Sequence, residues 1–182
     1  MQQTIGFLEL NSIAKGVQAA DAILKAADTQ LVFAKAVCPG KYIVLFTGEV
    51  AAVTSALEAG EAIAGVTAVD SVVIPSVDRQ VIKAINLSTV PEQTGAVGVM
   101  EFFSVTAAIY AADSAVKAAD VTLIDVRLAT GIGGKSFVVL TGDVSAVESS
   151  VKAGTQAASD KGLVVSSVVI PNPRPEIFES LY

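Results

Sequence analysis

The sequence is built from two copies of one pattern, and this duplication limits the fold more than any other feature. Four motifs recur in the same order about ninety residues further along the chain. They are IGFLEL at 5–10 and VGVMEF at 97–102, AADAILKAAD at 19–28 and AADSAVKAAD at 111–120, TGEV at 47–50 and TGDV at 141–144, and SVVIP at 71–75 and 167–171. A unit of this length is too long for a solenoid repeat and fits a small globular domain. We therefore expect two homologous domains, at residues 1–90 and 95–182, with a polar linker at 86–94.

Within each copy the hydrophobic period changes in a fixed order. In the first copy, an apolar strand precedes a helical spacing, two β-rich runs flank a Pro-Gly turn, and a second Ala-rich helix leads to a last strand closed by Pro75. The order β-α-β-β-α-β predicts an α+β sandwich of the ferredoxin-like kind, in which both helices cover one face of an antiparallel four-stranded sheet. The expected elements are strands at 4–10, 31–37, 42–46 and 71–74, and helices at 13–28 and 49–64.

Composition excludes several classes of function. With 52% apolar residues the chain can bury enough surface to fold, and this surplus predicts a homo-oligomer. The 12 basic and 18 acidic side chains include no basic run, so the positive surface that nucleic-acid binding requires is not formed. The chain has no His, which removes the commonest general base and the Ser-His and Cys-His nucleophile pairs. We therefore expect a protein that is neither an enzyme nor a nucleic-acid binder.

The sequence shows no pattern typical of a membrane span or of a signal peptide. The longest stretches without charge fall well short of the roughly 18 to 20 apolar residues that span a bilayer. The first residues, MQQTIG, lack the basic and apolar regions of a signal peptide. We expect a mature cytosolic sequence that does not cross a membrane.

Three motifs are candidates for a site, and each has a plainer interpretation. The run Gly133-Gly134-Lys135-Ser136 resembles the end of a phosphate-binding loop, but a strand follows it where that loop needs a helix, which favours a glycine-rich hairpin turn. Glu9 and Glu101 could form a paired-carboxylate site, and a half-buried polar position is the favoured interpretation. The lysines near the end of the first helix in each copy, Lys25 and Lys117, are cations placed favourably at a helix C-terminus.

Together these motifs resemble the bacterial microcompartment (BMC) shell domain, present twice. The resemblance rests on the Ile5-Gly6 and Val97-Gly98 openings with their following glutamates, the Ala-Ala-Asp helices, the Thr-Gly-Glu/Asp-Val helix starts and the closing Val-Ile-Pro. It covers essentially the whole chain. It implies a shell protein of the tandem type, a homotrimer that imitates a hexamer, tiles into a sheet with other shell proteins, and lies in the microcompartment shell of the bacterial cytoplasm.

The resemblance also implies which residues act in assembly. The loop between the second and third strands of each copy would line the central pore, and Lys25 and Lys117 would lie at the oligomer edge, against a neighbouring oligomer. The pore-loop residues are Cys38, Pro39, Gly40 and Lys41 in the first copy and Thr130, Gly131, Ile132, Gly133, Gly134 and Lys135 in the second.

Cys38 is the only cysteine of the chain. It stands in a predicted turn, and Thr130 occupies the matching position, so the fold does not require the thiol. In tandem relatives with a Cys-Pro-Gly-Lys loop, the resemblance implies a 4Fe-4S cluster at the trimer axis, to which three chains each give one thiolate, and a role in passing electrons to redox enzymes of the lumen. Two alternatives remain: a shell protein with a bare metabolite pore, and a soluble ferredoxin-like module that binds a small ligand.

Overall fold

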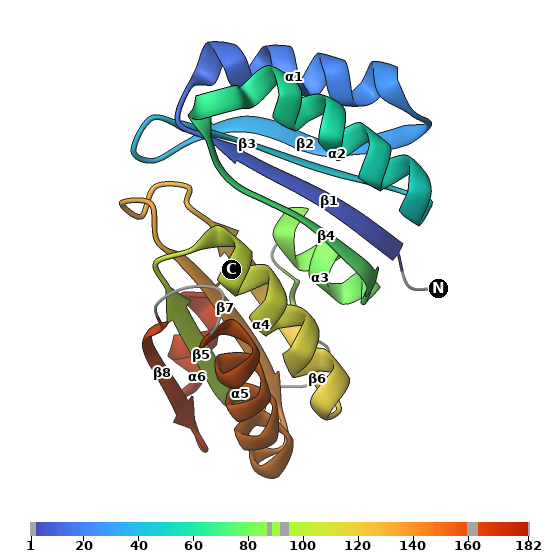
Figure 1. Cartoon of the computed structure of the whole chain (residues 1–182). Coiled ribbons are helices and arrows are strands. Elements are labelled where there is room, and N and C mark those ends of the chain that lie inside the picture. The colour runs from blue at the N-terminus through green and yellow to red at the C-terminus, as the bar shows by residue number, and fades with distance from the viewer. Residues whose placement is uncertain (1–2, 87–88, 92–94, 160–163, 182) are drawn as a thin grey trace. The chain divides into compact units, whose positions relative to one another are not determined.

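The chain folds into two compact units, residues Met1–Val77 and Asp78–Tyr182. The computed structural model describes residues 3–86, 89–91, 95–159 and 164–181. The first unit has the expected order of elements (Figure 1). Its elements are β1 (Gln3–Leu10), α1 (Ile13–Ala26), β2 (Thr29–Val37), β3 (Lys41–Gly48), α2 (Val50–Ala64), a 3-10 turn (Gly65–Thr67) and β4 (Ala68–Val77).

The four strands of the first unit form one antiparallel sheet in the order β2-β3-β1-β4. Side chains alternate between the two faces of a strand. Leu8 and Leu10 of β1 therefore point to the helix-covered face, where they join Phe46 of β3 in the core with residues of both helices. Ile5 and Phe7 point to the other face. Both helices thus cover one face of the sheet, which confirms the predicted sandwich (Figure 1).

The second unit repeats this arrangement with the strand order β6-β7-β5-β8. The helices α1 and α4 even begin alike, because Ser12 and Ser104 accept hydrogen bonds from the backbone N–H groups of Lys15 and Ala107. A hydroxyl at this position satisfies an N–H group that the helix itself leaves unpaired. The elements are β5 (Ala96–Phe102), α4 (Val105–Ala118), β6 (Val121–Leu128), β7 (Ser136–Gly142), α5 (Val144–Ser159) and β8 (Val164–Ile170).

Two short helices were not expected from the sequence. Helix α3 (Arg79–Asn86) packs on β6 and α4 within the second unit. The Gln80 side chain lies along the edge of β6, where its Nε2 donates to the Val121 carbonyl (3.4 Å) and its Oε1 accepts from the Leu123 N–H (3.2 Å). Helix α6 (Pro175–Glu179) places Phe178 against Val97, Ile124 and Val139 on the second face of its own sheet.

The strand β4 corrects one further expectation. It runs to Val77, so Pro75 lies inside the strand and does not close it. β4 is an edge strand, where the missing N–H of a proline costs no ladder hydrogen bond. The expected linker begins at Asn86, which is the last residue of α3, and positions 87–88 and 92–94 lie outside the described residues. The predicted limits 1–90 and 95–182 stay a prediction.

Among the described residues, one segment is long and apolar enough by length and composition to cross a membrane. This segment, Val50–Thr67, comprises α2 and the turn after it and has a mean hydropathy of 1.2. Its apolar side, with Val53, Ala56 and Leu57, lies in the core of the first unit. One side of α2 thus packs into the core, and 28% of the segment is buried.

The two units differ in the residues that fill the contact between the first helix and the third strand. In the first unit a Cβ added to Gly16 of α1 would lie 2.4 Å from the Tyr42 ring, so the absent side chain makes room for the tyrosine. In the second unit the matching residues are Ala108 and Ser136, and both are fully buried. The larger helix residue is thus paired with the smaller strand residue.

We predict that Gly16→Ala destabilises the protein by about 1–3 kcal/mol although alanine is the better helix former, because the methyl group overpacks the core. The double variant Gly16→Ala/Tyr42→Ser, which copies the second unit, should be less destabilised than the sum of the two single variants. Urea unfolding of the four proteins measures both effects. Additive losses of stability would show that the two positions are not coupled.

Candidate functional site

The first candidate loop is a tight turn that joins β2 to β3. Val37 faces Lys41 across the ladder, and the Gly40 N–H donates to the Val37 carbonyl at 3.0 Å. Gly40 has a φ of 89°, in the left-handed region that favours glycine, and a Cβ added there would meet nothing within 4 Å. Pro39 is exposed and the Cys38 thiol is free and partly exposed. The turn is therefore exposed at Pro39 and Gly40, and the cysteine before them is partly exposed.

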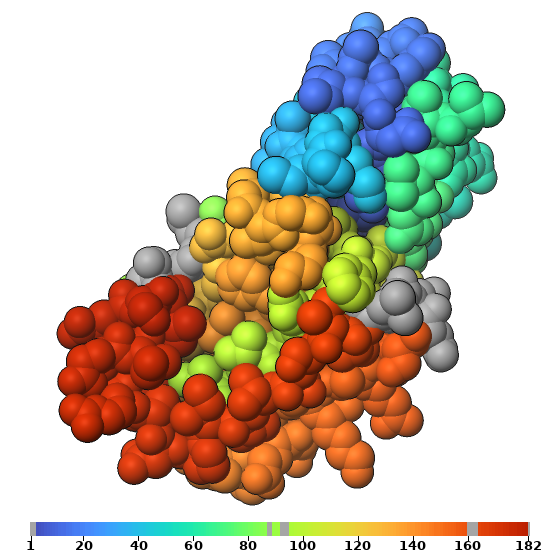
Figure 2. Space-filling model, turned by 90° about the vertical axis from the view of Figure 1, so that its left-hand side faces the viewer, coloured from blue at the N-terminus to red at the C-terminus, as the bar shows by residue number. Residues whose placement is uncertain are grey.

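The second candidate loop, residues 129–135, is longer and is shaped by glycine. Gly131, Gly133 and Gly134 all have positive φ, and so does Ala129. The Ala129 N–H donates to the Lys135 carbonyl at 3.1 Å, and β7 begins directly afterwards. These findings confirm the predicted hairpin turn. Figure 2 shows the loop region in orange and the first loop region in cyan, each at the surface of its own unit.

In both units the lysine at the end of the loop forms an ion pair with the glutamate of the first strand. Lys41 Nζ lies 2.9 Å from Glu9 Oε1, and the Glu9 side chain is only 7% exposed. Lys135 pairs with Glu101 in the same way. The expected half-buried position fits Glu101, whereas Glu9 is buried, and neither lysine partner was predicted. A charge of opposite sign at the matching loop position of both copies was the available signal.

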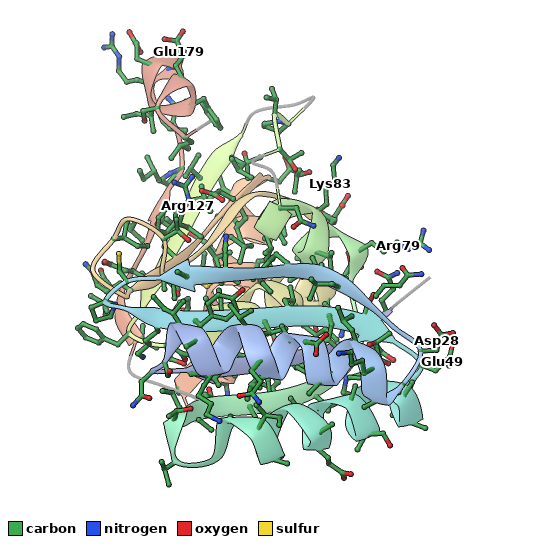
Figure 3. All side chains as sticks on the ribbon, turned by 90° about the horizontal axis from the view of Figure 1, so that it is seen from above. Asp28, Glu49, Arg79, Lys83, Arg127 and Glu179 are labelled. Atoms are coloured by element: carbon green, nitrogen blue, oxygen red, sulfur yellow. The ribbon has the colours of Figure 1, made fainter. Side chains whose placement is uncertain are left out.

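A second charged pair on the second sheet was also missed. Arg127 of β6, labelled in Figure 3, pairs with Asp125 at 2.7 Å and lies 5.7 Å from the centre of the Phe137 ring. In the first unit, Lys35 lies over Phe33 at 4.6 Å. A cation therefore lies next to an aromatic ring in both units, and Arg127 also pairs with a carboxylate of its own strand.

Lys25 and Lys117 lie in the last turns of α1 and α4, as predicted. Each pairs with the aspartate one turn before it, Lys25 with Asp21 at 2.6 Å and Lys117 with Asp113 at 2.5 Å. The Lys25 pair is largely exposed to solvent, whereas Asp113 is buried and also accepts a hydrogen bond from the Asp78 N–H. Their expected place at an oligomer edge stays a prediction.

Two further observations bear on ionisable groups. Within the part of the chain that the structure describes, no group of three or more His, Cys, Asp or Glu side chains is placed to hold a metal ion. Because the chain has one cysteine, a metal site held by several thiolates at Cys38 needs more than one chain.

At the start of α6, a backbone hydrogen bond and the Arg174 guanidinium hold the pKa of Glu176 below its ordinary value.

Comparison with known proteins identifies the family. Residues 4–77 and 96–173 each match the BMC domain. The chain is 45% identical over 181 residues to the bacterial microcompartment shell protein PduT of Citrobacter freundii. This alignment covers 100% of this chain and 98% of that protein. It is 30% identical to the carboxysome assembly protein CcmO of Synechococcus elongatus, over 97% of this chain and 68% of that protein. The chain belongs to the BMC domain family and carries two BMC domains.

Solved structures agree with this assignment. A crystal structure of a microcompartment protein from Desulfitobacterium hafniense matches with a TM-score of 0.93 and 49% identity, over 98% of this chain and 99% of that one. The fused permuted hexameric shell protein of the RMM microcompartment matches with a TM-score of 0.62 and 25% identity, over 86% and 84% of the two chains. The family resemblance and the fold class expected from the sequence are confirmed.

Proposed function

We propose that this chain is a tandem-type shell protein of a bacterial microcompartment, a structural protein that lies in the shell in the bacterial cytoplasm and assembles there with other shell proteins. The observation that carries the proposal is a complete BMC fold present twice in one chain, together with similarity to a named shell protein along the whole length.

A homotrimer is supported by an uncovered apolar stripe on α1. Ile13 and Val17 lie one turn apart and are 46% and 54% exposed. The matching residues of α4, Val105 and Ile109, are 1% and 0% exposed. The matching residues are thus buried on α4 and exposed on α1. We infer that a further chain packs against Ile13 and Val17 in the assembled protein. Three chains of two domains would give the six-domain outline of a hexamer.

We predict that Val17→Asp converts the trimer into monomers, because it places a charge in this apolar contact. The matched control is Val66→Asp, which makes the same change at a fully exposed valine in the turn after α2. Light scattering coupled to size exclusion gives the mass, and thermal unfolding checks that both variants fold. A Val17→Asp protein that keeps the mass of the parent would contradict the proposed seam.

For Lys25 and Lys117 we propose a role in contacts between trimers. Both occur at the same position of the duplicated fold, and both ammonium groups remain partly exposed beside their aspartates. The exposed pair of Lys25 with Asp21 stabilises its helix by only about 0.3–0.5 kcal/mol. Helix stability alone therefore gives little reason for the lysine of α1.

We predict that Lys25→Ala/Lys117→Ala leaves trimers intact and abolishes ordered sheets in electron micrographs. Asp21→Ala is the control, because it breaks the same ion pair in α1 and leaves the lysine in place. The single variant Lys25→Ala is compared with it. If Asp21→Ala disrupts sheets as strongly as Lys25→Ala does, loss of the ion pair and not loss of an edge contact is responsible. Ordered sheets of the double lysine variant would overturn the edge role.

We further propose that Cys38 from each of three chains ligates one 4Fe-4S cluster in the pore. The residues present fit such a group: the thiol is free and partly exposed, and the turn around it is open. Thiolates are the usual ligands of these clusters, and three of them would leave one iron for water or a small ligand. The cluster would supply one-electron transfer between redox enzymes of the lumen and carriers outside, while the loops hold the thiols in place.

We predict that anaerobic reconstitution yields about four iron atoms per trimer with a broad visible absorption. Cys38→Ser should lose both signals and keep the mass of the trimer. Thr130→Ser, a change of similar size in the matching loop, should keep both. Equal iron content in Cys38→Ser and the parent would refute the cluster and leave a bare metabolite pore, whereas a protein that forms neither trimers nor sheets would favour a soluble ligand-binding module.

A further inference from the structure

The ion pairs Lys41–Glu9 and Lys135–Glu101 join the two candidate pore loops to an inner strand of each sheet, β1 or β5. Glu9 faces Ile43 across the β1–β3 ladder, and Lys41 lies two residues before Ile43 on the same strand, hence on the same face. This is the face that α1 and α2 do not cover. Glu101 and Phe137 repeat the arrangement on β5 and β7, with Lys135 two residues before Phe137. The pair is therefore a duplicated feature of the fold.

We propose that Glu9 and Glu101 are positioning residues of the pore loops. Each carboxylate holds the lysine that ends its loop against the sheet, so it restricts the loop and balances the ammonium charge beside the pore. The inference rests on the proposed function, since it takes these loops to line the pore. Under this proposal the two glutamates act by positioning the loops, and not by filling the core or by catalysing a reaction.

The geometry shows why the first loop depends on this contact. Within the turn the Gly40 N–H donates to the Val37 carbonyl, and Pro39 and Gly40 are exposed. Lys41 is thus the first side chain after the turn that is tied to the body of the sheet. Glu9 is almost fully buried, and a buried carboxylate keeps its partner because an unpaired charge there is costly. The contact that satisfies Glu9 also fixes the end of the Cys38 turn.

The second loop has more internal support. In addition to its ion pair, the Lys135 N–H donates to the Ile132 carbonyl, and the Thr130 hydroxyl donates to the Leu128 carbonyl at 3.0 Å. Glu101 is also more exposed than Glu9. Loss of the glutamate should therefore loosen the first loop more than the second.

The single cysteine allows a direct test. A nitroxide attached to Cys38 of the metal-free full-length protein, diluted with a diamagnetic analogue of the label, reports the local mobility of the first loop by electron paramagnetic resonance. In Glu9→Gln we expect a mobile spectral component that the parent lacks. Glu101→Gln makes the same chemical change in the other unit and should leave the Cys38 spectrum unaltered. The reversed pair Glu9→Lys/Lys41→Glu should restore the parent spectrum.

Three results would overturn the proposal: an unchanged spectrum in Glu9→Gln, an equal change in Glu101→Gln, or no recovery in the reversed pair. If Glu9→Gln does not fold, Lys41→Gln removes the same pair from the exposed side and carries the test. The mass of the unlabelled parent is measured separately. A parent that is not trimeric refutes the proposed function, while the mobility data still decide whether the glutamate holds the loop.

Discussion

Each unit depends on one constraint: two helices cover a four-stranded sheet on a single face. The packing there is tight. A Cβ on Gly6 of β1 would lie 2.3 Å from the Phe46 ring of β3, and one on Gly60 of α2 would lie 2.8 Å from Ile23 of α1, so side chains on this face pack against glycines of the neighbouring strand and helix. The second face is also apolar, and Ile5 and Phe7 on it are fully buried although no helix of residues 3–77 lies there. A sheet whose helices cover only one face therefore needs further structure on the other face to bury these side chains.

The sequence predicted the parts of the fold that repeat and missed the parts that do not. Helices of 14 or 15 residues have enough turns to show their period, and α1 and α2 were found within two residues of their ends. Helices α3 and α6 have only 8 and 5 residues, too few for a period to stand out. The Lys41–Glu9 pair joins residues 32 positions apart, a contact that only the strand register brings together. Lys25 and Lys117, by contrast, were visible because each lies in a repeated helical motif.

Comparison of the two units separates what the fold needs from what it tolerates. Gly16 and Tyr42 of the first unit correspond to Ala108 and Ser136 of the second, so the larger helix residue occurs with the smaller strand residue. On the outer side of α2, Glu61 accepts a hydrogen bond from Ser71, whereas Thr155 stands at the matching place in α5 and its hydroxyl is buried without a partner among the described residues. At the first site both residues of a contact differ between the units, whereas at the second site only one does, because Ser71 has Ser167 as its counterpart.

The loops show what such freedom offers a fused chain. A ring of six identical domains must repeat every loop residue six times, whereas three tandem chains carry each unit's loop three times. Cys38 has Thr130 as its counterpart, so a trimer would gather three thiols and three hydroxyls rather than six of either. Both loops keep the lysine and its glutamate, which fix the loop ends, and they differ in the residues between. Duplication thus allows the chemistry of the loop to change while the contact that attaches it to the sheet is conserved in both copies.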